Sequence, residues 1–183
     1  DCEGCYHLSE YEFKNERKIS DFHFSHSRVC NAKCVYCSDF YSCGTTNYNT
    51  YPIIKDLIEK GYYKAGGEAT MQGGEPTMMQ NFEELVDLFI GTQIRVHSSA
   101  IKYSEKVAKA LEENKGSIVI SIDSATKNTY KRIKQVNAFD LVFENIRKYV
   151  QKSSENVIIK YVIVPGYNDN LIEIDKFFKI MHQ

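Results

Sequence analysis

The chain has 183 residues, a formal net charge of −1 and a hydrophobic fraction of 43%, which suits one globular domain with a substantial core. The balanced charge gives no indication of a nucleic-acid partner, and no apolar run is long enough to cross a bilayer. Six cysteines without a secretory leader indicate metal or redox chemistry and not a disulfide framework. We therefore expect a cytoplasmic protein and, because the first residue is Asp1, a piece of a longer chain.

Hydrophobic periodicity predicts strands and helices that alternate along the chain. Strands are expected at Ile19–His26, Tyr62–Gln72, Gln93–Ser98, Ser117–Ile122 and Val157–Val164. Helices are expected at Tyr51–Lys60, from Asn81 to before Gly91, at Ser104–Lys115, Asn128–Lys134, Phe139–Lys152 and Leu171–His182. Asn81 and Glu84 have the spacing of a capping box, and Gly116 is expected to stop the helix before it. Alternating strands and helices of this length are typical of βαβ units around a parallel sheet.

Three thiols follow the first predicted strand. Cys30, Cys34 and Cys37 have the spacing C-x3-C-x2-C within eight residues. A structural zinc site has four closed ligands, and an iron–sulfur cube also takes four, so a loop of three leaves one position open. An open position is what a catalytic metal centre needs. The alternative is a non-catalytic zinc module whose fourth ligand is Cys43 or His26.

Polar or glycine-rich stretches follow every predicted strand. The cysteine loop comes after the first strand, Gly73-Gly74-Glu75-Pro76 after the second, and His97-Ser98-Ser99 ends the third. Ser121-Ile122-Asp123-Ser124 ends the fourth, and Pro165 to Asp169 ends the fifth. The carboxyl edge of a parallel sheet is where barrel and open α/β folds place their sites. For the fifth stretch, a simple turn is an equally good interpretation.

The cysteine loop, with the aromatic Tyr36 before its last thiol, and the Gly-Gly-Glu-Pro stretch together resemble the radical S-adenosylmethionine (SAM) superfamily. The resemblance implies an α/β partial TIM-type (β/α)6-like barrel, of which about five βα units are present, so that the chain would end before the last strand. It implies a 4Fe–4S cluster on Cys30, Cys34 and Cys37, whose unique iron binds SAM through its amino and carboxylate groups. One electron then cleaves SAM to a 5′-deoxyadenosyl radical that abstracts a substrate hydrogen.

The resemblance also implies cofactor contacts at other positions. Tyr36 would meet the adenine through its backbone, and Gly73 and Gly74 would let the ligand approach closely. Glu75 would face the ammonium group. The remaining candidates are Ser98, Ser121, Asp123 and Lys134. Two departures from relatives are Ser99, where Asn is frequent, and Lys134, where arginine is frequent and would offer a bidentate fork.

Several of these residues have a structural alternative. Ser121 and Asp123 alternate and should leave the strand on one face, but Asp123 is also a candidate helix cap. Lys134 is a candidate surface lysine and Tyr36 an ordinary packed tyrosine. Lys160 either reaches the barrel interior or is simply solvated.

The front of the chain carries a second pair of thiols, Cys2 and Cys5. We expect residues 1–18 to be the tail of a cysteine-rich segment similar to SPASM or twitch modules, with 19–183 forming the radical SAM domain. Cys2 and Cys5 then help hold a second iron–sulfur cluster, or they are unpaired thiols or part of a zinc knuckle. Cys43 is expected to be a small buried residue. The partners implied are a peptide or small-molecule substrate and an electron donor such as flavodoxin or ferredoxin, with no membrane and no nucleic acid indicated.

Overall fold

A computed structural model describes residues 18–25, 27–38, 49–89 and 91–182. The strands form one parallel sheet in which each strand pairs with the next along the chain, in the order β1-β2-β3-β4-β5. The strands are β1 (Phe22–Phe24), β2 (Glu68–Met71), β3 (Gln93–Ser98), β4 (Gly116–Ser121) and β5 (Val157–Lys160). Because all strands run the same way, their carboxyl ends lie along one edge, as expected for consecutive βα units.

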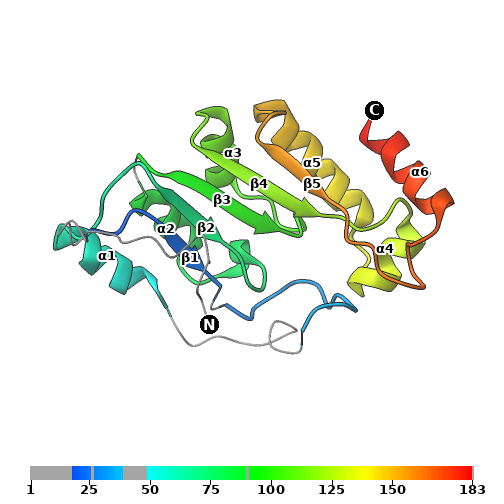
Figure 1. Ribbon diagram of the computed structural model, residues 1–183, viewed down its shortest axis with the longest axis horizontal. Helices are drawn as coiled ribbons and strands as arrows, with labels where there is room; N and C mark the ends of the chain where they lie inside the picture. The colour runs from blue at the N-terminus through cyan, green and yellow to red at the C-terminus, as the bar shows by residue number, and fades with distance from the viewer. Residues whose placement is uncertain (1–17, 26, 39–48, 90, 183) are drawn as a thin grey trace, which may run out of the picture.

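Helices connect the strands (Figure 1). They are α1 (Tyr51–Glu59), α2 (Phe82–Leu88), α3 (Glu105–Glu112), α4 (Lys127–Lys134), α5 (Phe139–Lys152) and α6 (Leu171–Met181), with a short 3-10 turn η1 (Pro76–Met78) after β2. Figure 1 shows α2, α3 and α5 on one face of the sheet. The fold class expected from the sequence, a partial (β/α) barrel, is confirmed.

The core lies between the sheet and these helices. Val96 of β3 and Ile118 and Ile120 of β4 are fully buried there, in one cluster with Leu111 of α3 and Val142 of α5. Since side chains alternate along a strand, the neighbouring positions point to the opposite face. On β3 these are Arg95 and His97, both only partly buried. The sheet therefore has an apolar face under its helices and a polar face that continues towards the carboxyl edge.

The predicted bounds of the elements match the observed ones at α5 and β3 and differ more elsewhere. The bounds of α5 and β3 are as predicted, while β1, β2 and β5 are shorter than their apolar runs. Gly116 does not stop α3, because Asn114 takes the left-handed conformation (φ 54°) and Gly116 already begins β4. The capping-box prediction at α2 was wrong. Asn81 is itself left-handed, and its amide donates to the Glu84 carboxylate at 3.3 Å and caps no backbone group.

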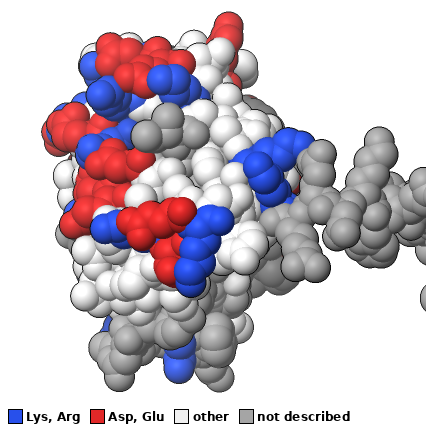
Figure 2. All heavy atoms as spheres, turned by 90° about the vertical axis from the view of Figure 1, so that its left-hand side faces the viewer, with Lys and Arg blue, Asp and Glu red and all other residues white. Residues whose placement is uncertain are grey.

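Charged side chains of both signs are interspersed on the face shown in Figure 2, with no extended region of a single sign. Among the described residues, exposed ion pairs such as Lys60 with Asp56 and Lys106 with Asp87 join charges of opposite sign. This agrees with the balanced composition. In the described ranges, every helix is too short or too polar to traverse a lipid bilayer.

Candidate active site

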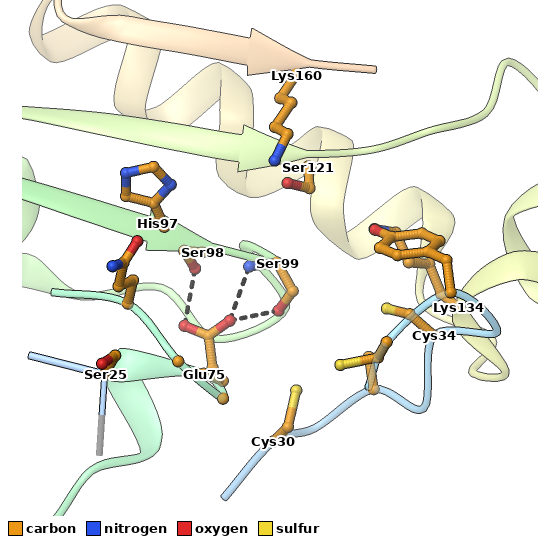
Figure 3. Close-up of a pocket in the computed structure, with 16 residues that line it drawn as sticks. Ser25, Cys30, Cys34, Glu75, His97, Ser98, Ser99, Ser121, Lys134 and Lys160 are labelled. Carbon is orange, nitrogen blue, oxygen red and sulfur yellow. Dashed lines mark hydrogen bonds between the residues drawn. The ribbon is translucent and has the colours of Figure 1, made fainter. Parts of the chain in front are cut away.

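A cavity of about 400 Å³ opens at the carboxyl edge of the sheet (Figure 3). Every strand, or the segment directly after it, contributes to its wall. The lining residues are Ser25, Cys30, Ala32, Cys34, Tyr36, Cys37, Gln72, Gly73, Gly74, Glu75, His97, Ser98, Ser99, Ser121, Lys134 and Lys160. The cavity thus brings together most of the candidate residues, from positions more than 100 residues apart in the sequence.

The cysteine loop is fixed by its backbone to the end of α4. The amides of Lys33 and Val35 donate to the carbonyl oxygens of Lys134 and Ile133, at 3.0 and 2.9 Å. These carbonyls belong to the last turn of a helix, which lacks intrahelical donors. The loop therefore satisfies the helix end while the helix end holds the loop, and the thiols take no part in either contact.

The three thiols of the loop are partly buried. Burial, and to a smaller extent the nearby Glu75 carboxylate, raises the pKa of the Cys30 thiol to about 11. A thiol must lose its proton to bind a metal. Metal binding at Cys30 would therefore release a proton at neutral pH.

Gly73 and Gly74 lie directly against the chain that leads to the cysteines. The amide of Gly74 donates to the Ser27 carbonyl at 2.8 Å, and the amide of Glu75 to the Val29 carbonyl at 2.7 Å. A Cβ on Gly74 would lie 2.3 Å from the Val29 carbonyl oxygen. The sequence predicts close approach of a ligand to these glycines, and the structure shows that the chain's own backbone approaches Gly74 closely.

We expect Gly74→Ala to push the Ser27–Val29 segment away and to destabilise the fold by about 1–3 kcal/mol, as overpacking does. Urea unfolding measures the loss of stability, and hydrogen exchange of the amides of residues 27–35 shows where it arises. Gly61→Ala is the control. It strains the backbone, since Gly61 has φ +72°, but an added Cβ there meets no atom within 4 Å, so no segment is pushed away. Protection of the 27–35 amides that falls no more in Gly74→Ala than in Gly61→Ala would contradict the packing role.

Glu75 is a buried carboxylate that joins the segment after β2 to the end of β3, with 1% of its surface exposed. Oε1 accepts from the amide and hydroxyl of Thr77 at 3.3 and 2.8 Å and from the Ser98 hydroxyl at 2.8 Å. Oε2 accepts from the amide and hydroxyl of Ser99, both at 2.7 Å. All these donors are neutral, so these contacts bring no positive charge to the carboxylate at the cavity wall (Figure 3).

A buried ion pair lies beneath the cysteine loop. Lys134 Nζ lies 2.5 Å from Asp123 Oδ2, with 2% and 0% of these side chains exposed. The Tyr36 hydroxyl donates to the same carboxylate oxygen at 2.5 Å and accepts from Lys134 Nζ at 2.9 Å. The second oxygen, Oδ1, accepts from the Val162 amide at 2.7 Å. The Asp123 carboxylate at the end of β4 is therefore the point where the cysteine loop, α4 and the segment after β5 meet.

Two expectations about Asp123 were wrong. Ser121 lines the cavity, but Asp123 lies behind Tyr36 and Lys134, because β4 ends at Ser121 and Asp123 takes the left-handed conformation (φ 59°). The alternation of a strand does not extend to it. Asp123 also does not cap α4, whose N-cap is Thr126.

The stretch after β5 supports this arrangement and does not line the cavity. The buried Asn168 donates to the Asp123 carbonyl at 2.7 Å and to the Val162 carbonyl at 2.8 Å, and its Oδ1 accepts from the Val164 amide at 2.6 Å. Of the two interpretations open for Pro165 to Asp169, the structural one agrees with these contacts.

The sequence did not single out Ser25, Gln72 or His97 as site residues, although all three line the cavity. Like Lys160, they lie on the polar face of a strand or just after its end. The signal available was the alternation of Arg95 and His97 with the buried Val96. Cys2, Cys5, Cys43 and His26 lie outside the described residues.

The sheet topology and the cavity at its carboxyl edge define an α/β domain of the partial-barrel class. The sequence model of the radical SAM superfamily matches residues 24–178, most of the chain. The chain therefore belongs to the radical SAM superfamily, whose cofactors are a 4Fe–4S cluster and SAM.

Curated relatives include a GTP 3′,8-cyclase of Clostridium botulinum (strain Okra / Type B1), 25% identical over 174 residues, which are 91% of this chain and 54% of the relative. A GTP 3′,8-cyclase of Vibrio parahaemolyticus is 25% identical over 175 residues, 91% of this chain and 52% of the relative. The chain thus spans about half the length of the curated relatives it matches.

Solved structures agree with the fold. The structure of anSMEcpe with bound AdoMet superimposes with a TM-score of 0.67 at 22% identity, over 89% of this chain and 49% of that one. Streptococcus suis SuiB bound to the precursor peptide SuiA gives a TM-score of 0.64 at 15% identity, over 88% and 37% of the two chains. At these identities the likeness shows the fold alone.

Proposed function

We propose that the chain is the cofactor-binding part of a radical SAM enzyme that cleaves SAM reductively and abstracts a hydrogen atom from a substrate. The observation that carries this proposal is the cavity wall itself, where three thiols from one loop face the glycine loop and Glu75 across a single space. When bound, the cluster and SAM supply the one-electron cleavage of the sulfonium–carbon bond. The chain's own residues bind these groups, orient them and exclude water.

The residues present fit an iron–sulfur cluster. In the described ranges, no three His, Cys, Asp or Glu side chains converge on a point where they could share one ion. In a cluster each thiolate binds its own iron, so three thiols that do not converge on one point can still serve as its ligands. The buried Tyr130 hydroxyl has no hydrogen-bond partner among the described residues. Burial raises the pKa of Tyr130, and the charge of Cys34 raises it to a smaller extent.

In this proposal, Cys30, Cys34 and Cys37 are the cluster ligands. Glu75 attracts the SAM ammonium group, because its charge is solvated by neutral donors and not cancelled by a cation. Gly73, Gly74, Ser98 and Ser121 form the adjoining wall, and Tyr36 meets the adenine with its backbone. Lys134 acts differently from the expectation. With its charge balanced by Asp123, it positions the loop through Tyr36 while one side of it lines the cavity.

The substrate is proposed to be a peptide or a small metabolite. Two relatives are named as cyclases of GTP, and one structural neighbour was solved with a precursor peptide. Peptide modification is favoured if Cys2 and Cys5, within the proposed segment 1–18, contribute to a second cluster. The enzyme would be cytoplasmic and would take electrons from a flavodoxin or ferredoxin.

Anaerobic reconstitution with iron and sulfide tests the proposed function. We expect a broad absorption shoulder from the cluster, and 5′-deoxyadenosine after addition of SAM and a reductant. A parallel sample loaded with zinc controls for the alternative metal. Tightly bound zinc that iron does not replace, together with no SAM cleavage, would show that the chain is a zinc module.

The role of Glu75 gives a separate prediction. Glu75→Gln keeps the size of the side chain but removes its charge, so SAM affinity should fall by tenfold or more, since a hydrogen bond to a charged group is worth about 1.5–3 kcal/mol. Equilibrium dialysis with labelled SAM measures this affinity, and iron analysis shows that cluster loading changes less. Glu84→Gln on the exposed side of α2 is the control. Equal SAM affinity in the two variants would leave Glu75 with only its loop-joining role.

A further inference from the structure

Lys160 occupies a distinct place in the cavity. It is the last residue of β5 and lies in register with Ser121 on the neighbouring strand. Figure 3 shows its side chain directed towards Ser121, on the side of the cavity away from Cys30 and Cys34. The residue is exposed to solvent and lines the cavity, so a ligand can reach its ammonium group.

Of the two cations that line the cavity, Lys134 has a charged partner and Lys160 has none among the described residues. Three lining residues other than the thiols carry a full charge, namely Glu75, Lys134 and Lys160. Glu75 has five neutral donor contacts, and Lys134 is paired with Asp123 at 2.5 Å. Within the described ranges, no carboxylate lies within ion-pair distance of Lys160. On the same face, Arg95 is also satisfied, by Glu68 at 3.0 Å.

The neighbours of Lys160 are suited to an anion. The Ser121 hydroxyl lies on the adjacent strand and donates readily. His97, one strand further, is held neutral, because burial lowers the pKa of its imidazole and the positive charge of Lys160 lowers it further. A neutral imidazole still has one N–H to donate. A lysine ammonium with two neutral donors around it is a suitable arrangement for carboxylate or phosphate oxygens.

We propose that Lys160, with Ser121 and His97, binds a carboxylate or phosphate group of the substrate. This inference rests on the proposed function. The group is assigned to the substrate and not to SAM, because the SAM carboxylate is expected at the cluster, and the cysteines lie on the opposite side of the cavity from Lys160 (Figure 3). A substrate held at Lys160 would project into the space between the two.

The test uses the reconstituted chain and two simple probes, inorganic phosphate and acetate. Binding is followed by the ³¹P linewidth of phosphate and by saturation transfer to acetate, with and without saturating SAM. The variants are Lys160→Met and Lys160→Arg, and Lys148→Met on the surface of α5 is the control. SAM affinity and cluster absorbance are measured on the same samples.

We expect Lys160→Met to weaken binding of the preferred anion by tenfold or more. Lys160→Arg and Lys148→Met should retain it, and SAM affinity and cluster loading should be unchanged. The probe that binds more tightly identifies the group as a phosphate or a carboxylate. Unchanged anion binding in Lys160→Met, loss of anion binding when SAM is added to the wild-type chain, or a parallel fall in SAM affinity would each overturn the proposal. Failure of SAM cleavage with intact, Lys160-dependent anion binding would instead count against the proposed function alone.

Discussion

Cys34→Ala is expected to abolish cluster assembly and leave the fold intact. The loop is held by backbone hydrogen bonds from Lys33 and Val35 to the end of α4, and neither bond involves a cysteine side chain. The amide of Cys37 donates to the Cys34 carbonyl at 3.0 Å, which alanine also provides. Removing the thiol therefore removes a ligand and keeps the backbone hydrogen bonds that shape the loop.

The measurement for Cys34→Ala combines iron and sulfide analysis with thermal unfolding of the apo chain. Bound iron should fall to background, and the apo unfolding temperature should match that of the wild type. Lys33→Ala is the matched control, because it changes an exposed side chain of the same loop and keeps the backbone bond. A Cys34→Ala chain that still assembles a cluster and cleaves SAM would exclude Cys34 as a ligand.

The elements that the sequence predicts well are those determined by local pattern. The bounds of α5 follow from an apolar stripe over 14 residues, and β3 is bounded by its own alternation. The start of β4 at Gly116 was not predictable in this way, since it depends on the left-handed conformation of Asn114. Local propensity favours such a turn at either residue. The packing of the fold decides between them.

For the site, residue types were predictable and their partners were not. Glu75 is a charged residue in a glycine loop, and nothing in its neighbourhood along the chain indicates bonds to Ser98 and Ser99, more than 20 residues later. Gly74 looks like a ligand-binding glycine, but an added Cβ there would first meet the Val29 carbonyl oxygen. In each case the missing information is a contact between separate strand ends, which only the folded sheet brings together.

The partners in the ion pair of Lys134 and Asp123 could not be predicted from the sequence either. Breaking this pair is expected to cause a large loss of stability. The sequence indicates two cofactor contacts, while the structure shows two buried charges that compensate each other. Asp123→Ala would leave the Lys134 ammonium buried without a counter-charge and would also remove the acceptor for Tyr36 and the Val162 amide. Removal of one partner of a buried ion pair costs about 3–5 kcal/mol, and we expect a loss of that size in urea unfolding.

The matched control for this pair is Asp140→Ala. Asp140 pairs with Lys127 at 2.7 Å, but both side chains are largely exposed, so its loss should cost about 0–1 kcal/mol. The double variant Asp123→Ala/Lys134→Met removes both buried charges and should recover part of the stability lost in Asp123→Ala. Equal effects of Asp123→Ala and Asp140→Ala would mean that the pair is not buried in solution. If the double variant were less stable than Asp123→Ala, Lys134 would contribute through contacts other than its charge.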